Sequence, residues 1–314
     1  MNAEIERLPL NGNSTQVYEP IRYILSLGGK RFRPLLVLLA YEMFREDVEK
    51  ALKPALAVEL FHNFTLMHDD IMDKAPLRRG KPTVHEKWNT NTAILSGDIM
   101  FVKVYELLEG VDGNKLPEIF KLFNKCAIEV CEGQQLDMDN ELRDDVTIDE
   151  YLEMIRLKTA VLIGTSLQLG AILADAPPEK AALLKAFGDH LGIGFQLKDD
   201  LLDVYGDQQK FGKQVGGDII SNKKTFLLLK AEEMSSGAAK KELNQLLSGT
   251  FSDPSDKVQK VTEIYDSLNI KSEAETKMQQ YFDTAFSFLN QLELDESKKA
   301  AVRNFAQNLI KRDH

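Results

Sequence analysis

Two clusters of aspartates have the residue type and spacing to do chemistry in this sequence. One is Asp69-Asp70-Ile71-Met72-Asp73, and the other, far along the chain, is Asp199-Asp200-Leu201-Leu202-Asp203. In each, the first and last aspartates are four residues apart, which places them on one face of a helix. Carboxylate oxygens are hard ligands, and two on one face can share Mg²⁺ while leaving positions open for phosphate oxygens.

The alternative is that each cluster is an ordinary solvated helix face. There, like charges at this spacing cost only a few tenths of a kcal/mol. The surrounding residues favour binding, because FTLMH precedes the first cluster and GIGFQLK the second. Facing an apolar cleft, carboxylates ~6 Å apart would repel by ~3 kcal/mol at an effective dielectric constant of 20. Bound cations would remove that penalty.

Two other metal sites fit the sequence less well. A calcium-binding loop starting at Asp69 fails on spacing, because Lys74 stands where the loop needs its glycine. His62 and His68 hint at a His-Asp phosphohydrolase, but that interpretation leaves the second aspartate cluster without a purpose.

Basic residues accompany both clusters. Any one of them is by default a solvated surface charge. Together, forked arginines and long lysines beside two metal clusters suit a diphosphate. The pattern indicates one phosphate site bridged by metal and another held by cations alone. The residues are Lys30, Arg31 and Arg33 in GGKRFRP, Arg78 and Arg79 after the first cluster, and Lys213 and Lys223 after the second.

The elements that must position these residues are helices. A capping box, Thr147 followed by Glu150, begins one helix, and Pro177–Pro178 stops it. Strand patterns are nearly absent. We therefore predict an all-α fold, a single-domain helical bundle over residues 1–314 with a continuous interior. Apolar spacing and these stop signals predict helices over 35–44, 51–68, 92–108, 116–139, 147–175 and 179–205.

Composition restricts the partners and the compartment. The 314 residues carry 49 acidic and 39 basic side chains, a net charge of −10, which argues against nucleic acid but not against a small anion. Two cysteines cannot build a disulfide framework. The most apolar stretch, residues 160–174, is too short and too polar to span a bilayer, and the N-terminus has no apolar signal core. We expect a cytoplasmic protein without a membrane span.

Taken together, these motifs resemble the trans-isoprenyl diphosphate synthases. GGKRFRP, HDDIMD, LRRGKPTVH, the Lys158–Thr159 pair, GFQLKDDLLD, GKQVGGD and NKKT occur in the order typical of that family, over residues 28–229. The resemblance implies an all-α fold around a central cavity, a homodimer, and Mg²⁺-dependent condensation of isopentenyl diphosphate with an allylic diphosphate, with three ions in each site.

The resemblance also implies a role for each matching residue. Asp69, Asp73 and Asp199 would bind Mg²⁺, supported by Asp70, Asp200 and Asp203. Arg78, Lys158, Lys213 and Lys223 would contact the allylic diphosphate, with Lys224 as the alternative to Lys223. Lys30, Arg33, His62 and Arg79 would hold isopentenyl diphosphate. Thr159 and Gln196 would lie beside the ionising carbon, Gln134 and Asp137 would support the site, and residues 207–225 would form a lid.

Product length would depend on the residues just before the first cluster. Phe64 lies five residues before Asp69, ~7.5 Å along a helix, and Thr65 lies four before. Phe64 can be ordinary core packing, or, as in the resembling family, a floor that stops the growing chain. With small Thr65 beside it and Phe61 one turn deeper, we expect a C20 product, with C15 as the alternative.

Three other functions share some of these features. A terpene cyclase usually lacks the second aspartate cluster and residues such as Lys30 and Arg33. A regulatory synthase subunit typically loses its aspartates, and here none is missing. A simple acidic ion-binding protein would leave the ordered cations unexplained.

Overall fold

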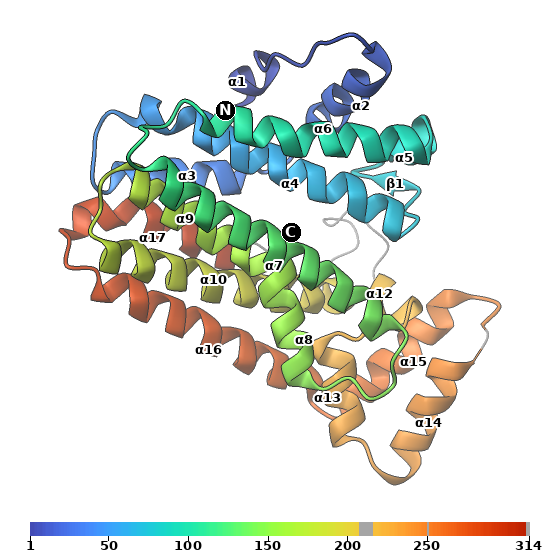
Figure 1. The fold of residues 1–314 in the computed structure, drawn as a ribbon. Coiled ribbons are helices and arrows are strands. Elements are labelled where there is room, and N and C mark those ends of the chain that lie inside the picture. The colour runs from blue at the N-terminus through green and yellow to red at the C-terminus, as the bar shows by residue number, and fades with distance from the viewer. Residues whose placement is uncertain (207–215, 250, 312–314) are drawn as a thin grey trace. The chain divides into compact units, whose positions relative to one another are not determined.

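The computed structural model describes residues 1–206, 216–249 and 251–311, whose regular secondary structure is almost entirely helical (Figure 1). The expected all-α fold is confirmed. Its helices are α1 (Asn2–Glu6), α2 (Thr15–Ser26), α3 (Phe32–Glu42), η1 (Val48–Ala51), α4 (Leu52–Met72), α5 (Val84–Lys87), α6 (Thr90–Leu108), α7 (Leu116–Glu141), α8 (Ile148–Ile155), η2 (Arg156–Ala160), α9 (Val161–Leu173), α10 (Pro178–Tyr205), α12 (Gly217–Ile220), α13 (Phe226–Met234), α14 (Gly237–Ser248), α15 (Pro254–Ser267), α16 (Ile270–Gln291) and α17 (Glu296–Lys311).

The basic segment that follows the first aspartate cluster forms a small β-hairpin. Strands β1 (Leu77–Arg78) and β2 (Lys81–Pro82) pair antiparallel, with Arg78 opposite Lys81. Arg79 and Gly80 make the turn with φ of 53° and 72°, left-handed values that glycine adopts without steric cost. The hairpin follows α4 directly, so the first aspartate cluster and the two arginines lie on consecutive segments of chain.

Contacts between Cα atoms divide the chain into two compact units. Unit 1 comprises Met1–Asn124 and Thr165–Ala182, and unit 2 comprises Lys125–Gly164 and Leu183–His314. Helices α7, α9 and α10 contribute residues to both. The first aspartate cluster belongs to unit 1 and the second to unit 2. That residues 1–314 form one domain remains a prediction.

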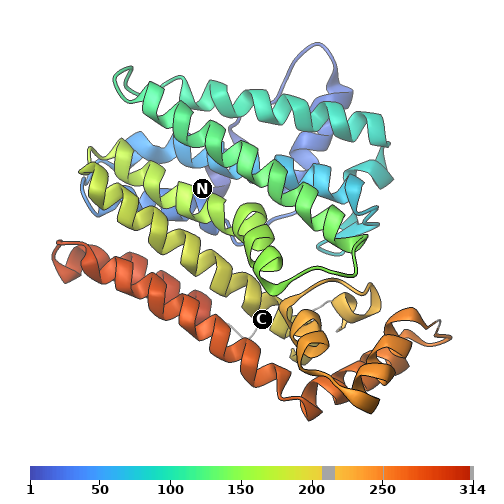
Figure 2. The same cartoon turned by 60° about the horizontal axis from the view of Figure 1, so that its bottom comes forward.

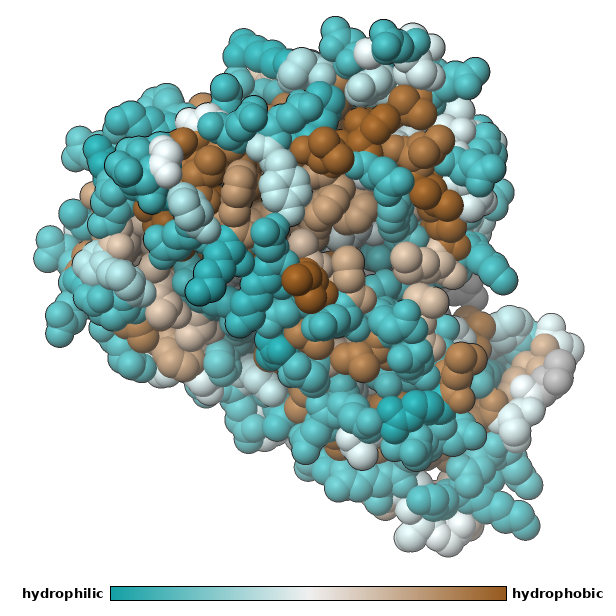
Figure 3. Space-filling model, in the orientation of Figure 1, coloured by the Kyte–Doolittle hydropathy of each residue, from teal (hydrophilic) through white to brown (hydrophobic). Residues whose placement is uncertain are grey.

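In unit 1, helices α4 and α6 lie side by side along most of their length (Figures 1 and 2). Gly97 permits this approach, because a Cβ atom there would lie 2.2 Å from Nε2 of His68. One side of α6 packs in the core through residues such as Met100 and Val104. Another side exposes Leu95 and Val102, at 54% and 60% of their surface, and Figure 3 shows hydrophobic side chains gathered along this helix.

In unit 2, the capping box predicted at Thr147 and Glu150 is present and begins α8. The helix predicted to run unbroken to residue 175 contains an irregularity, because η2 is a π-helical segment between α8 and α9. Such segments widen a helix by one residue and occur often at functional sites. Here the segment carries Lys158 and Thr159.

Among the described residues, one helical stretch, Ile148–Leu173, is long and apolar enough to cross a membrane. However, 78% of its most apolar part is buried inside the protein, which is typical of a core helix.

Candidate functional site

The first aspartate cluster closes α4. Asp69 and Asp70 lie in its last turn and Asp73 is its C-terminal cap. Asp70 points inward and is only 2% exposed, where its two oxygens accept hydrogen bonds from Nε (2.8 Å) and NH2 (2.7 Å) of Arg78. Because two Arg78 donors hold the β-hairpin to α4, this arginine fixes the end of the helix in addition to any contact with substrate. Asp69 and Asp73 lie one helical turn apart, as the spacing predicts.

A cluster of cations surrounds His62 in unit 1. NH1 of Arg33 lies 3.1 Å from Nε2 of His62, and NH1 of Arg79 donates to the carbonyl of Gly28. Desolvation, and then the positive charges of Arg33, Arg79, Arg78 and Arg31, lower the pKa of His62 well below 6.5. His62 is therefore neutral at pH 7, and its Nε2 accepts from Arg33 in the tautomer that keeps the Nδ1 proton.

The pKa of Arg79 is affected by the same neighbouring positive charges. Desolvation and the neighbouring guanidinium groups of Arg31 and Arg78 lower its pKa from 12.5. Arginines that repel one another and still stay together form a ready site for an anion, because a bound phosphate removes the repulsion. Lys30, the remaining residue assigned to this phosphate site, directly precedes Arg31 in the same segment.

Arg31 has a different role from the one that its place in GGKRFRP suggests. Its guanidinium forms a buried ion pair with Glu59 on α4 and donates to the carbonyl of Leu25. Asn63 donates to the same Glu59 carboxylate (2.8 Å). Arg31 itself takes a left-handed φ of 47° immediately before α3. Arg31 therefore anchors the segment that presents Lys30 and Arg33.

Aromatic rings fill the space around Phe64. Its ring is stacked on Phe101 of α6 (centroids 5.2 Å apart, planes at 30°) and lies 4.7 Å from the ring of His68. Phe61, one turn deeper on α4, contacts Phe64, Phe101 and Phe123. Phe64 is therefore the outer ring of a packed aromatic cluster, and Thr65 beside it donates to the carbonyl of His62 (2.9 Å). Sequence reasoning found Phe61 and Phe64 but missed Phe101.

In unit 2, Asp137 of α7 lies between two lysines. Nζ of Lys158 is 2.5 Å from Oδ2 of Asp137, and Nζ of Lys223 is 4.0 Å from the same oxygen. Burial would raise the pKa of Asp137, but the charges of Lys223 and Lys158 outweigh it and hold the pKa below 3.8. The carboxylate thus keeps two ammonium groups near one point. Lys224 lies 3.7 Å from Asp144 instead, which supports Lys223 as the ligand in NKKT.

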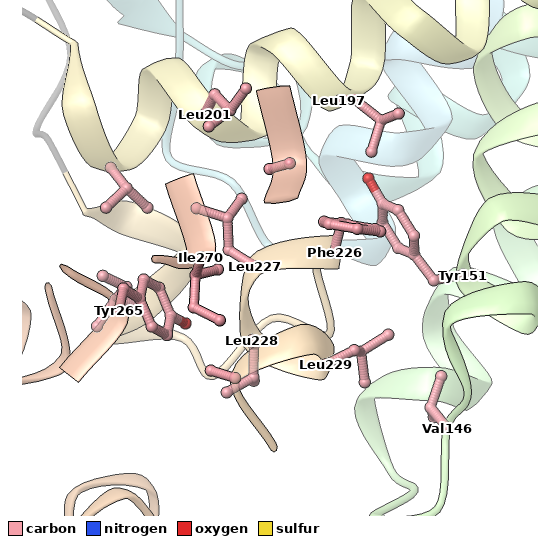
Figure 4. Close-up of a cluster of buried hydrophobic side chains, with 14 of the residues drawn as sticks. Val146, Tyr151, Leu197, Leu201, Phe226, Leu227, Leu228, Leu229, Tyr265 and Ile270 are labelled. Atoms are coloured by element: carbon pink, nitrogen blue, oxygen red, sulfur yellow. The ribbon is translucent and has the colours of Figure 1, made fainter. Parts of the chain in front are cut away.

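A chain of hydrogen bonds joins Thr159 to the second aspartate cluster. Thr159 donates to Oε1 of Gln196 (3.3 Å), and Nε2 of Gln196 donates to Oδ1 of Asp200 (3.0 Å). The other oxygen of Asp200 accepts from the hydroxyl of Tyr151. Tyr151 is 1% exposed and lies among Leu197 and Phe226 in an apolar cluster (Figure 4). Its ring reads as core in the sequence, so nothing in the pattern predicted this contact.

The environment of Asp200 disfavours the ionised form of its carboxyl group. Burial, and then the negative charge of Asp218, raise its pKa to about 7, although Tyr151 and Gln196 donate to it. A carboxyl group with this elevated pKa gains stability when a cation binds nearby. The amide of Gln134 is also buried at a cost in free energy. Its side chain is 7% exposed, and neither its oxygen nor its nitrogen has a hydrogen-bond partner in the described part of the chain.

The sequence and the fold of the chain are similar to those of known proteins. A family model, Polyprenyl synthetase, matches residues 14–267. The chain is 37% identical over 308 residues to a geranylgeranyl diphosphate synthase of Saccharolobus solfataricus, covering 96% of this chain and 92% of the relative. A crystal structure of a geranylgeranyl pyrophosphate synthase superposes with a TM-score of 0.94 at 42% identity, covering 99% and 96% of the two chains. The chain belongs to the polyprenyl synthetase family. It is a prenyltransferase.

A solved polyprenyl synthase of Caulobacter crescentus contains calcium and isoprenyl diphosphate, and this chain resembles it with a TM-score of 0.87 at 26% identity, covering 99% of this chain and 94% of that one. Among the residues that the structure describes here, no group of three or more Asp, Glu, His or Cys side chains gathers to hold a metal by itself. Each cluster of this polyprenyl synthetase offers carboxylate oxygens only, the ligands that suit Mg²⁺ with substrate phosphates completing its coordination. The donor set therefore fits the metal. Lys213 lies outside the described residues.

Proposed function

We propose that this synthase condenses isopentenyl diphosphate with allylic diphosphates of C5 to C15 and releases mainly C20 geranylgeranyl diphosphate. The group formed by Arg33, Arg79 and neutral His62 is the observation that carries the proposal, because the positive charge that lowers the pKa of both His62 and Arg79 would be offset by a bound phosphate. Such a site, together with two aspartate clusters, matches a reaction that brings two diphosphates together.

We assign the site residues by their chemistry. Lys30, Arg33, His62 and Arg79 bind isopentenyl diphosphate through charge and through the Nδ1 proton of His62. Asp69, Asp73 and Asp199 hold Mg²⁺, proposed as three ions, and Arg78, Lys158, Lys213 and Lys223 bind the allylic diphosphate. The metal, when bound, neutralises the diphosphate so that it can leave.

The reaction needs no nucleophilic side chain. The allylic C–O bond breaks, and its electrons stay with the departing diphosphate, whose charge the lysines stabilise. The double bond of isopentenyl diphosphate attacks the allylic cation, and the released diphosphate takes the proton that restores the double bond. Thr159 and Gln196 present hydroxyl and amide oxygens that stabilise the cation, and they are held in place by Asp200. Apolar walls exclude water, which would otherwise capture the cation.

The product length follows from the aromatic cluster. Phe64 is held by stacking on Phe101, so its ring cannot swing aside without breaking that packing. A growing chain that reaches it stops. The small side chain of Thr65 leaves the space of one further side chain open, which supports C20 over C15.

We also propose a homodimer in the cytoplasm. Ile94, Leu95 and Val102 of α6 expose 40%, 54% and 60% of their surface, and large apolar side chains this exposed on one helix favour association with a second copy. Equilibrium sedimentation of wild type and of Val102→Glu tests this proposal. A monomeric wild-type enzyme would contradict it.

The deciding experiment incubates purified protein with labelled isopentenyl diphosphate, Mg²⁺ and, separately, C5, C10 and C15 allylic diphosphates, and sizes the products by chromatography and mass spectrometry. We expect a metal-dependent product that stops at C20. Asp69→Ala and Asp199→Ala should each lower turnover by several orders of magnitude in folded protein, and near-normal turnover would refute the metal assignment. A C15 end product would support the condensation reaction but contradict the position that we propose for the floor. No elongation with any primer would favour a cyclase or a regulatory subunit.

A further inference from the structure

Lys257 is a buried lysine that the reaction does not use directly. It lies on α15 and is 5% exposed. Its ammonium donates to the carbonyl of Ile220 (3.1 Å) and to Oδ1 of Asn222 (2.6 Å). A lysine is rarely buried, because its charge loses solvation on leaving water. Here the buried ammonium joins α15 to the short turn that contains Asn222.

That turn leads directly to the lysines of NKKT. It follows α12, and Asn222 takes a left-handed φ of 56° within it, a conformation that asparagine tolerates better than most residues. Nδ2 of Asn222 donates to the carbonyl of Leu247 (2.9 Å), so both ends of its amide are held. The next residue, Lys223, donates its backbone N–H to the carbonyl of Asp218 (2.9 Å).

The other end of α12 is tied to the second aspartate cluster. The backbone N–H of Asp218 donates to Oδ2 of Asp203 (2.9 Å), and that of Gly216 donates to the carbonyl of Asp203 (2.7 Å). Hydrogen bonds therefore hold both ends of α12: Asp203 binds its start, and Lys257 binds its end and the turn that follows. Lys223 is the residue immediately after Asn222, and its Nζ lies 4.0 Å from Oδ2 of Asp137.

We propose that Lys257 is a positioning residue for Lys223, holding its ammonium where the allylic diphosphate binds. This inference rests on the proposed function of Lys223 and assigns a role to a helix outside the family motifs. A neutral side chain at 257 fills the same space but leaves two acceptors, the carbonyl of Ile220 and Oδ1 of Asn222, without their donor. The turn then loses the contact that sets its conformation, and Lys223 loses its place.

The test is a double-mutant cycle on steady-state kinetics of the full-length enzyme with C15 allylic diphosphate. Lys257→Met should raise KM for the allylic substrate about tenfold and leave KM for isopentenyl diphosphate unchanged. Lys260→Met, an exposed lysine on the same helix, is the matched control and should change neither. In the Lys223→Ala background, Lys257→Met should have little further effect, because its target is already gone.

Three outcomes would overturn the inference: unchanged allylic KM in Lys257→Met, equal rises in both KM values, or a full additional effect in the Lys223→Ala background. If Lys257→Met does not fold, Asn222→Gly, which keeps the left-handed conformation without strain, removes the same hydrogen bond from the other side and should show the same substrate selectivity. If Lys223→Ala itself leaves the allylic KM unchanged while elongation continues, the assignment of Lys223 fails separately. If wild-type protein makes no product, the proposed function fails.

Discussion

Replacing Gly133 by alanine should damage the site, although Gly133 itself has no side chain that could bind substrate. Gly133 lies on α7 opposite the π-helical segment η2, where a Cβ atom would be 2.3 Å from the backbone nitrogen of Lys158 and 2.7 Å from its Cα. Ordinary contact begins at 3.4 Å, so η2 must move by about 1.1 Å. Backbone cannot rotate away as a side chain can, and overpacking of this kind costs ~1–3 kcal/mol.

The consequence for activity is larger than the consequence for stability. A shift of ~1 Å in a positioned group can cost ~10²-fold in rate, and η2 carries both Lys158 and Thr159. We expect kcat of Gly133→Ala to fall about a hundredfold, measured by incorporation of labelled isopentenyl diphosphate, with a lower melting temperature by calorimetry. Gly113→Ala is the control, because nothing lies within 4 Å of a Cβ atom there. Near-normal kcat in Gly133→Ala would refute the claim that this close contact fixes the catalytic pair. A gain in stability, which alanine normally brings inside a helix, would refute the steric argument itself.

Other predictions concern unit 1. Phe64→Ala should lengthen the product, and Phe101→Ala should do so to a smaller extent by releasing the Phe64 ring; an unchanged product distribution in both would remove the aromatic cluster as the floor. Glu59→Gln should lower the free energy of unfolding by ~3 kcal/mol in denaturant titrations, because it leaves Arg31 buried without its counter-charge, and a loss below ~1 kcal/mol would contradict this. The folded-state pKa of His62 lies below its unfolded value of 6.5, so the unfolded chain takes up the proton first and stability should fall as pH drops below about 6.5. His62→Gln should remove that part of the pH dependence, and an identical pH profile in the variant would refute the shift.

Much of the fold could be predicted from apolar spacing. The predicted helix over 92–108 corresponds to α6 (Thr90–Leu108), that over 116–139 to α7 (Leu116–Glu141), and that over 179–205 to α10 (Pro178–Tyr205). The errors in these three are at the ends and amount to one or two residues. The π-helical segment could not be predicted, because the spacing within residues 156–160 is the same as in an ordinary helix. A tertiary contact accompanies it: α7 approaches so closely at Gly133 that a Cβ atom there would lie 2.3 Å from the backbone nitrogen of Lys158.

The candidate site was predictable in residue type but not in the use of each donor. The order of motifs identified the arginines of unit 1, yet Arg31 binds Glu59 and two donors of Arg78 bind Asp70. Sequence alone cannot separate a cation that faces a ligand from one that anchors its neighbours, because the difference lies in which residue of a distant helix is opposite. Tyr151 was missed for the same reason, since its hydroxyl meets Asp200 inside an otherwise apolar cluster.

The buried ion pair of Arg31 and Glu59 orients the site and adds little to the stability of the fold. A buried ion pair is often no more stable than an apolar pair of similar volume, so the pair of Arg31 (9% exposed side chain) and Glu59 (4%) is a poor way to hold a fold together. The same ion pair is well suited to orienting the backbone, because the donors of a guanidinium have a fixed geometry. Here it orients the segment that carries Lys30 and Arg33. The double replacement Arg31→Met with Glu59→Leu should therefore leave the melting temperature unchanged or raise it, while KM for isopentenyl diphosphate rises at least tenfold and KM for the allylic substrate stays constant. A large fall in melting temperature with an unchanged KM would show that the pair supports the fold and does not orient the site.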